Sequence, residues 1–341
     1  MTVFVLVPAI HERRTGGNIY NRRVATHLEA RATVHTVPWR PAEGLPDLDT
    51  GTEAVLLVDS LHLRHPDGVR ALREAHPEAI LVLLSHYLHC VDPSAREGDA
   101  AAGERAVLPL FDGAITPSAY VRRALVEEGM PEAHVGAAPP GLDDRFRTDP
   151  PPVTPTTPPR LLTVANLVPG KGLPVLVDAL ARCRDQPWRA TLVGDEALDP
   201  DYARQVKARI READLTDRIE QTGPLPPAAL RRRYDEADLF VLPSRFETCS
   251  MATREAMARG CAVVASEVGG LPENLGDAAA PGAASASRDN AAGVLIPPED
   301  PAALAEALRS LLTNPERRQR MGRAARERSR AFPPWSDTAQ R

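Results

Sequence analysis

Residues 239–260 read Leu-Phe-Val-Leu-Pro-Ser-Arg-Phe-Glu-Thr-Cys-Ser-Met-Ala-Thr-Arg-Glu-Ala-Met-Ala-Arg-Gly, and this stretch decides the fold. The apolar run 239–242, closed by a proline, predicts a short buried strand of a parallel sheet. Ser244 and Thr248 are candidate N-caps of a helix that follows, and Gly260 is expected to end that helix. A strand, a tight loop and a helix in this order are typical of open α/β sheets, which bind ligands at the carboxyl ends of their strands.

Two carboxylates belong to this stretch, Glu247 in the loop and Glu255 in the helix. Their separation of about two helical turns predicts that they project from nearly the same side. An ionised carboxylate only accepts hydrogen bonds, so it suits the paired hydroxyls of a sugar or a ribose. For the pair taken alone, the alternative is a capped surface helix that carries two solvated glutamates.

The whole string resembles the signature of retaining GT-B glycosyltransferases, the large GT4-like group, in which two glutamates follow Pro-Ser and the second begins Glu-Ala-Met-Ala-x-Gly. Pro243-Ser244, Glu247 and residues 255–260 match it. The resemblance implies that Glu247 contacts the donor-sugar hydroxyls and that Glu255 holds the ribose of the nucleotide. It places three further residues beside the donor, Arg245, Cys249 and Met251. The family usually has a glycine where Ser250 stands, so this serine is expected to narrow the donor pocket or to change donor choice.

The composition fits a globular protein, and the length fits two domains. The chain has 341 residues, of which 43% are hydrophobic and 26% charged. Its net charge of −5 does not indicate the basic surface that nucleic-acid binding requires. No signal peptide and no membrane-spanning run are predicted, whereas peripheral contact with a membrane stays open. The cysteines lack metal or disulfide spacing and predict a reducing compartment, so the cytoplasm is expected. The arginine- and alanine-rich composition is typical of a bacterial genome rich in G and C.

Two series of apolar runs alternate with helical patterns and predict two Rossmann-like domains that face each other across a cleft, the GT-B fold. The predicted strands are Val3–Val7, Thr33–Val37, Ala54–Val58, Ile80–Leu84, Gly113–Ile115 and His134–Ala138, then Arg160–Val164, Ala190–Val193, Ile219–Thr222, Leu239–Leu242, Ala262–Ser266 and Gly293–Ile296. The expected domains are 1–148 on the acceptor side, a proline-rich linker 149–159, a donor domain 160–320, and a terminal segment 321–341 that the resemblance returns to the first domain.

Further donor-site residues lie in loops that follow predicted strands. Gly16 and Gly17 precede a helix for which Asn18 is the expected N-cap, as in the family's N-terminal glycine loop. Lys171 lies among glycines before a helix, where it can neutralise the diphosphate leaving group, although a solvated lysine is the alternative. Asn166 stands where the family usually has an arginine, and Arg245 is the candidate for the missing charge. The resemblance implies three further loop residues near the phosphate or base, which are Gly194, Gly223 and Leu225.

Three histidines, His62, His86 and His89, follow predicted strands, but their spacing fits no compact metal motif, so no metal is expected. The resemblance implies that His86 faces the donor sugar; a loop histidine bonded to backbone is the alternative. Residues 277–292, rich in Ala, Gly, Ser and Pro, are expected to form a surface insertion.

The reading that these residues favour is a retaining hexosyltransferase that uses a nucleotide diphosphate sugar, UDP rather than GDP, without metal or cofactor. His86, Lys171 and Glu247 are its candidate catalytic residues. The sequence shows no carboxylate at a position suited to act as a nucleophile. The resemblance therefore implies a front-face substitution that the leaving phosphate assists. The acceptor, whether a small molecule, a glycan or a lipid-linked compound, and the oligomeric state stay open. A nucleotide-sugar 2-epimerase of the same fold and a catalytically silent binding module are the alternatives.

Overall fold

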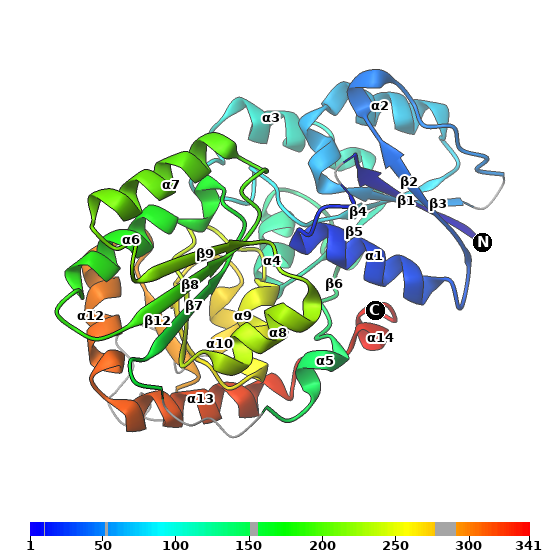
Figure 1. Cartoon of the computed structure of the whole chain (residues 1–341). Coiled ribbons are helices and arrows are strands. Elements are labelled where there is room, and N and C mark those ends of the chain that lie inside the picture. The colour runs from blue at the N-terminus through cyan, green and yellow to red at the C-terminus, as the bar shows by residue number, and fades with distance from the viewer. Residues whose placement is uncertain (10, 52–53, 151–155, 277–290) are drawn as a thin grey trace. The chain divides into compact units, whose positions relative to one another are not determined.

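The computed structural model describes residues 1–9, 11–51, 54–150, 156–276 and 291–341. The chain separates into two compact units, both drawn in Figure 1. Unit 1 consists of Met1–Gly141 and Pro333–Arg341, and unit 2 consists of Leu142–Phe332. Residues 151–155 of the expected proline-rich linker and residues 277–290 of the expected surface insertion lie outside the described residues.

A parallel sheet forms the centre of unit 1. The sheet has six strands in the described part of this unit, and their spatial order is β2-β1-β3-β4-β5-β6. Their bounds are β1 (Thr2–Pro8), β2 (Thr33–Trp39), β3 (Ala54–Asp59), β4 (Ile80–Leu84), β5 (Gly113–Thr116) and β6 (Val135–Ala137). Strand β1 pairs with β2 on one side and with β3 on the other, so the strand order reverses between β1 and β3. Loops leave the sheet in opposite directions at such a switch point, which opens a crevice for ligands.

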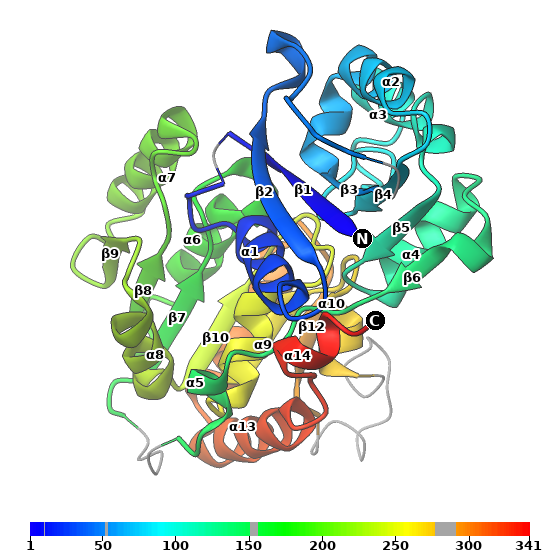
Figure 2. The same cartoon turned by 90° about the vertical axis from the view of Figure 1, so that its right-hand side faces the viewer.

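The period-two pattern of β1 explains how its faces are covered. Val3, Val5 and Val7 point to one face and pack with Ala25 of α1 (Gly16–Leu28), so this helix covers that face. The helices α2 (Pro66–Ala75), α3 (Asp99–Arg105) and α4 (Ala119–Glu127) complete the unit before residue 141. Figure 2 shows α1 and α2 on opposite sides of the β1–β3 strands.

The last residues of the chain belong to unit 1. The short helix α14 (Trp335–Thr338) packs on α1, where the rings of Trp335 and Tyr20 meet edge to face at 5.7 Å. The Thr338 hydroxyl donates a hydrogen bond of 2.8 Å to the carbonyl of Pro139. Gly141 leaves room for this packing, since a Cβ there would stand 2.5 Å from the backbone nitrogen of Trp335.

Unit 2 repeats the architecture with a larger core. Its described strands form a parallel sheet in the order β12-β11-β10-β7-β8-β9. They are β7 (Arg160–Val164), β8 (Arg189–Val193), β9 (Ile219–Gly223), β10 (Leu239–Leu242), β11 (Ala262–Ser266) and β12 (Gly293–Ile296). All four residues of β10 are buried, as expected for a central strand covered on both faces. The strand order reverses between β7 and β10.

Helices cover both faces of this sheet (Figure 1). The helices of unit 2 in its described residues are α5 (Asp144–Arg147), α6 (Leu173–Arg182), α7 (Pro200–Glu212), α8 (Pro227–Glu236), α9 (Met251–Ala258), α10 (Leu271–Leu275), α12 (Pro301–Leu312) and α13 (Pro315–Ser329). Helices α6, α7 and α12 lie on one face, and α8 and α9 lie on the other.

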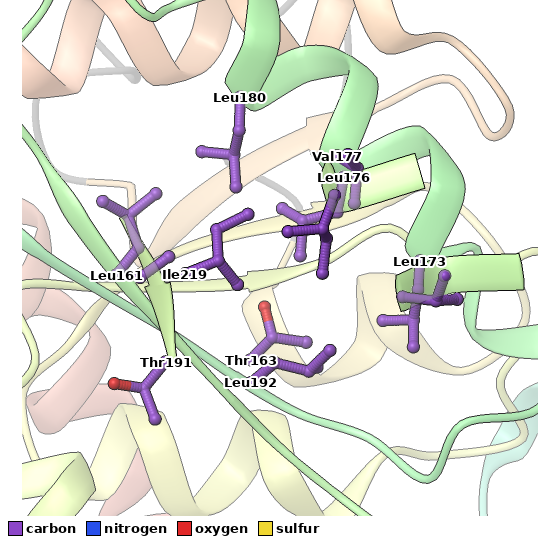
Figure 3. A pocket seen from close by; sticks show the side chains of 12 residues that line it. Leu161, Thr163, Leu173, Leu176, Val177, Leu180, Thr191, Leu192 and Ile219 are labelled. Carbon is purple, nitrogen blue, oxygen red and sulfur yellow. The ribbon is translucent and has the colours of Figure 1, made fainter. Parts of the chain in front are cut away.

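A small gap lies between β7–β9 and the helices α6 and α7, and Figure 3 shows side chains that line it. It holds about 10 Å³ and is lined mainly by leucine, valine and isoleucine. The hydroxyl of Thr163, which also lines it, is already bonded to the carbonyl of Val241 at 2.8 Å. A ligand site needs convergent polar groups, so this gap is a packing defect of the core.

The predicted strands are confirmed: all twelve are present, and their ends agree within two residues. Ser118 caps α4 and Asp300 caps α12, each through a side-chain oxygen that accepts from a backbone N–H of the first turn. The cap expected at Asn18 is wrong, because the Thr15 hydroxyl accepts from the Asn18 backbone N–H and the helix begins at Gly16. Thr15 is the N-cap of α1, because its side-chain oxygen reaches the third backbone amide of the first turn.

Candidate active site

The switch point of unit 2 brings two loops together at the carboxyl ends of β7 and β10. One loop carries Lys171 and the other carries Glu247, which are 76 residues apart in sequence. Lys171 Nζ and Glu247 Oε1 form an ion pair of 2.6 Å, and Glu247 is almost fully buried. The sequence singled out both residues separately, and the topology makes them partners.

Backbone contacts hold these two loops against each other. Gly172 has φ +62°, and a Cβ at this position would lie 2.0 Å from the carbonyl oxygen of Pro243. The backbone N–H of Arg245 donates to the carbonyl of Gly170 at 2.9 Å. Only a glycine allows so close an approach in this conformation, so Gly172 fixes where Lys171 stands.

Glu247 is oriented by its surroundings for the acceptance of further hydrogen bonds. The hydroxyl of the buried Ser244 donates to the same Oε1 at 2.8 Å. The other oxygen, Oε2, accepts no hydrogen bond from the described residues. Ser244 was expected as a helix cap, and that expectation is wrong, because its hydroxyl serves the carboxylate instead.

The cap of α9 is Ser250, neither Ser244 nor Thr248. Its hydroxyl accepts from the backbone N–H of Thr253 at 3.3 Å, and its φ of +65° lies in the left-handed region. Residues with a side chain rarely adopt this conformation, so the turn before α9 holds Ser250 in a strained backbone conformation. The buried Asn274 supports the turn by donating to the carbonyl of Cys249. Gly260, with φ +78°, follows the end of α9 as predicted.

Glu255 lies on α9 with a different set of partners from Glu247. Its Oε2 accepts a hydrogen bond of 2.9 Å from the hydroxyl of Tyr234 on α8. Burial first, and then the nearby carboxylate of Glu255, raise the pKa of Tyr234, so the phenol stays a donor at neutral pH. The two glutamates that the spacing placed on one side thus join separate hydrogen-bond networks.

The other donor-site candidates of unit 2 surround these loops. Asn166 Oδ1 accepts from the backbone N–H of Asp195 at 3.2 Å, which ties the loop after β7 to the loop after β8. Gly194 lies in the same contact, since a Cβ there would meet the Ala165 carbonyl oxygen at 1.9 Å. The half-exposed Arg245, the candidate for the missing cation, pairs with Glu299 at 2.8 Å.

The remaining donor-site candidates of unit 2 are Gly223, Leu225, Cys249 and Met251. Gly223 ends β9 with φ +67°, and Leu225 is partly buried. Cys249 is buried, and burial raises the pKa of its thiol, so it acts as a small apolar residue. Met251 is the first residue of α9.

In unit 1, His86 stands just after β4, close to the first turn of α1, where Gly16 and Gly17 lie inside the helix and not in the loop expected before it. A Cβ on Gly17 would lie 3.1 Å from the imidazole ring, whereas Gly16 has open space around it. The His86 Nε2 lies 2.6 Å from Asn21 Oδ1 and 3.7 Å from Asp59 Oδ2. Burial lowers the pKa of His86, and the charge of Asp59 opposes that shift more weakly.

Sequence reasoning missed Asn21 and Asp59, both fully buried polar residues. The Asn21 Nδ2 donates to Asp59 Oδ2 at 2.6 Å. A signal for Asp59 was present, because it directly follows the apolar run 54–58 at the carboxyl end of a strand. Asn21 sits in an ordinary helical pattern, so only the structure reveals its role.

The other two histidines considered for a metal lie apart from this network. The ring of His62 packs at a tilt against that of Trp39, with centroids 4.8 Å apart, and burial lowers the pKa of this histidine. His89 Nδ1 lies 2.7 Å from Oε1 of the buried Glu104. In the described part of the chain, no group of three or more His, Cys, Asp or Glu side chains has the arrangement of a metal site. No helix in the same residues has the length and apolar character needed to cross a bilayer.

The comparisons with known proteins agree with this geometry. The sequence profile of the family Glycosyl transferases group 1 matches residues 144–328. A D-inositol 3-phosphate glycosyltransferase of Kineococcus radiotolerans is 31% identical over 76% of this chain and 64% of its own length. The protein with the same name from Nocardia farcinica is 29% identical over 100% of this chain and 82% of its own length. The chain therefore spans less than two thirds of the Kineococcus protein.

Solved structures share the architecture. Sucrose-phosphate synthase of Thermosynechococcus elongatus has a TM-score of 0.78 at 21% identity, covering 99% of this chain and 96% of that one. HepE of Anabaena, in complex with UDP-glucose, has a TM-score of 0.76 at 18% identity, covering 100% and 97%. At these identities the likeness shows the fold, which is GT-B.

Proposed function

The chain belongs to the glycosyl transferases of group 1, and we propose that it moves a hexosyl unit from a nucleotide diphosphate sugar to an acceptor hydroxyl. The proposed donor is a UDP-sugar, the proposed outcome is retention of the anomeric configuration, and neither metal nor cofactor takes part. The observation that carries this proposal is the Lys171–Glu247 pair at the switch point of unit 2.

This pair offers a cation and an anion at one place. Lys171 lies just before the N-terminus of α6, where backbone N–H groups and the helix dipole also favour an anion. A bound diphosphate would take Lys171 as its partner and neutralise the charge that develops on the leaving group. Glu247 Oε1 would then be released from Lys171 to accept sugar hydroxyls, together with Oε2.

The Glu255 carboxylate is proposed to hold the ribose. One of its oxygens already accepts from Tyr234, which fixes the carboxylate in one orientation. A preorganised acceptor loses less conformational entropy when the ribose hydroxyls bind. The order of these parts along unit 2, with Lys171 after β7 and Glu255 on α9, matches a nucleotide sugar laid across the carboxyl ends of the strands.

The choice of donor draws on relatives. HepE was solved with UDP and with UDP-glucose, which makes UDP-sugars the first donors to test. The relatives from Kineococcus and Nocardia carry the name D-inositol 3-phosphate glycosyltransferase, so this polyol phosphate is the first acceptor to test. The four free, buried cysteines fit a reducing compartment, and we propose the cytoplasm.

The first experiment is calorimetric titration of UDP, GDP and ADP into wild type, Glu255→Ala and a control, Glu306→Ala. Glu306 is an exposed helical glutamate on α12, so its loss changes helix composition without touching the site. We expect one nucleotide to bind, Glu255→Ala to weaken it about tenfold, a loss of ~1.4 kcal/mol, and Glu306→Ala to leave it unchanged. Binding of no nucleotide would overturn the proposal.

Turnover then separates the reaction classes. A transferase releases UDP from a UDP-sugar when an acceptor is added, and NMR of the product reports whether the anomeric configuration is retained. An epimerase would form a new sugar with little nucleotide release. Nucleotide binding without either product would identify a silent binding module and contradict the proposed catalysis.

A further inference from the structure

We propose that Asp59 and Asn21 are positioning residues that hold His86 as the neutral tautomer protonated at Nε2, so that Nδ1 is presented as the acceptor for a substrate hydroxyl. The inference deepens the proposed function, on which the role of His86 toward a sugar rests. The tautomer itself follows from the geometry of unit 1 alone.

The carboxylate fixes the orientation of the amide. Asp59 is 1% exposed, and its Oδ1 accepts from the backbone N–H of Leu61 at 2.9 Å. Its Oδ2 lies 2.6 Å from the side-chain amide of Asn21. A carboxylate has no proton to donate, so the amide nitrogen of Asn21 must face it. The amide oxygen then has to point the other way, toward His86.

The amide in turn fixes the imidazole. Asn21 Oδ1 is a pure acceptor, and it lies 2.6 Å from His86 Nε2, so Nε2 carries the proton. In the neutral ring Nδ1 then holds a lone pair. Burial favours the neutral ring, and Asp59, the nearest carboxylate, lies 3.7 Å from Nε2 with its charge already shared with Asn21 and Leu61.

Packing prevents the ring from escaping this arrangement. The ring of Tyr20 on α1 meets the imidazole edge to face at 5.1 Å, and a Cβ on Gly17 of the same helix would lie 3.1 Å from it. The hydroxyl of Ser60 accepts from the backbone N–H of His86 at 3.0 Å and from that of Tyr87 at 3.1 Å, which anchors the loop after β4. Nδ1 accepts no hydrogen bond from the described residues, and the side chain remains 13% exposed. A hydroxyl of the sugar or the acceptor is the chemical group that this lone pair suits.

The test is nitrogen NMR of the histidine side chains in the free protein at neutral pH. With ¹⁵N-labelled histidine, long-range proton correlation distinguishes a protonated ring nitrogen from a bare one. We expect His86 to show a protonated Nε2 and a bare Nδ1. His89, whose Nδ1 faces the Glu104 carboxylate, is the internal control with the opposite pattern. A protonated Nδ1 on His86 in the wild type would overturn the inference.

Two variants test the relay. Asn21→Leu removes the bridge at similar size, and Asp59→Asn keeps the shape but lets the Asn21 amide reverse. In each, the His86 Nδ1 signal is expected to shift toward the protonated position while the His89 signals stay fixed. An unchanged His86 pattern in a folded variant contradicts the relay.

Nucleotide titration of the same variants separates this inference from the proposed function. Because both substitutions lie in unit 1, UDP affinity is expected to match that of the wild type. A wild type that binds no nucleotide yet shows the predicted tautomer would leave the relay standing and remove the donor site. If Asp59→Asn fails to fold, Asn21→Leu and the wild-type spectrum still decide the matter.

Discussion

A methyl group added to Gly172 is expected to separate the two loops that carry Lys171 and Glu247. An alanine there would adopt φ +62°, which costs ~1–2 kcal/mol for a residue with a side chain. Its Cβ would also stand 2.0 Å from the Pro243 carbonyl oxygen, so the loops must part by about 1 Å. Overpacking of this kind costs about 1–3 kcal/mol, which gives a total of about 2–5 kcal/mol.

Gly170 supplies the matched control two residues earlier in the same loop. A Cβ there meets nothing within 4 Å, and its φ lies outside the left-handed region. Gly170→Ala is therefore expected to leave stability unchanged or raise it by about 0.5 kcal/mol, through a stiffer unfolded chain.

Urea unfolding measures the difference. Trp188 is buried in unit 2, so a Trp39→Phe, Trp335→Phe background makes its fluorescence report on that unit alone. With a denaturant slope of about 2 kcal/mol/M, Gly172→Ala should lower the midpoint by roughly 1–2.5 M. Equal midpoints for Gly172→Ala and Gly170→Ala would refute the packing argument.

Three further predictions concern single side chains. Ser250→Gly should raise stability by about 0.5–1 kcal/mol, because relief of the left-handed φ outweighs a lost cap; a lower thermal midpoint would contradict this. Arg259→Met should cost ~1.5–3 kcal/mol in urea, since it removes the buried guanidinium that bonds the Asp235 carboxylate at 2.5 Å and the Thr148 carbonyl at 2.6 Å; a loss below 1 kcal/mol would argue against that pairing. Glu128→Gln should destabilise unit 1 by about 1 kcal/mol at pH 7. The hydrogen bond from Arg105 holds the folded-state pKa of Glu128 below its ordinary 4.5. The stability difference between wild type and Glu128→Gln should therefore vanish as pH falls through that folded-state pKa. A difference in stability that persists in acid would exclude the ion pair as its cause.

The strands could be predicted from sequence because fully buried parallel strands are short apolar runs between turn residues. Residues 239–242 are such a run, and the helix end at Gly260 carried an equally local signal. The N-cap of α9 carried no such local signal, because Ser244, Thr248 and Ser250 all have side chains that can cap a helix. The backbone path through the loop chose among them, and that path depends on contacts with the preceding loop.

The site was predictable residue by residue but not as an arrangement. Lys171 and Glu247 were each singled out, yet their pairing depends on β7 lying beside β10, which is long-range information. Asn21 was missed because a buried polar residue on the inner face of a helix has no signature until its partners are known.

The place of residues 333–341 in unit 1 has a consequence for biosynthesis. Unit 2 is inserted in the chain between two parts of unit 1, so a ribosome makes all of unit 2 before it supplies Trp335. Until then Tyr20 lacks the ring against which it packs, and Tyr20 in turn contacts His86. The nascent N-terminal unit must therefore wait, with an uncovered aromatic surface beside His86, for the final residues of this sequence.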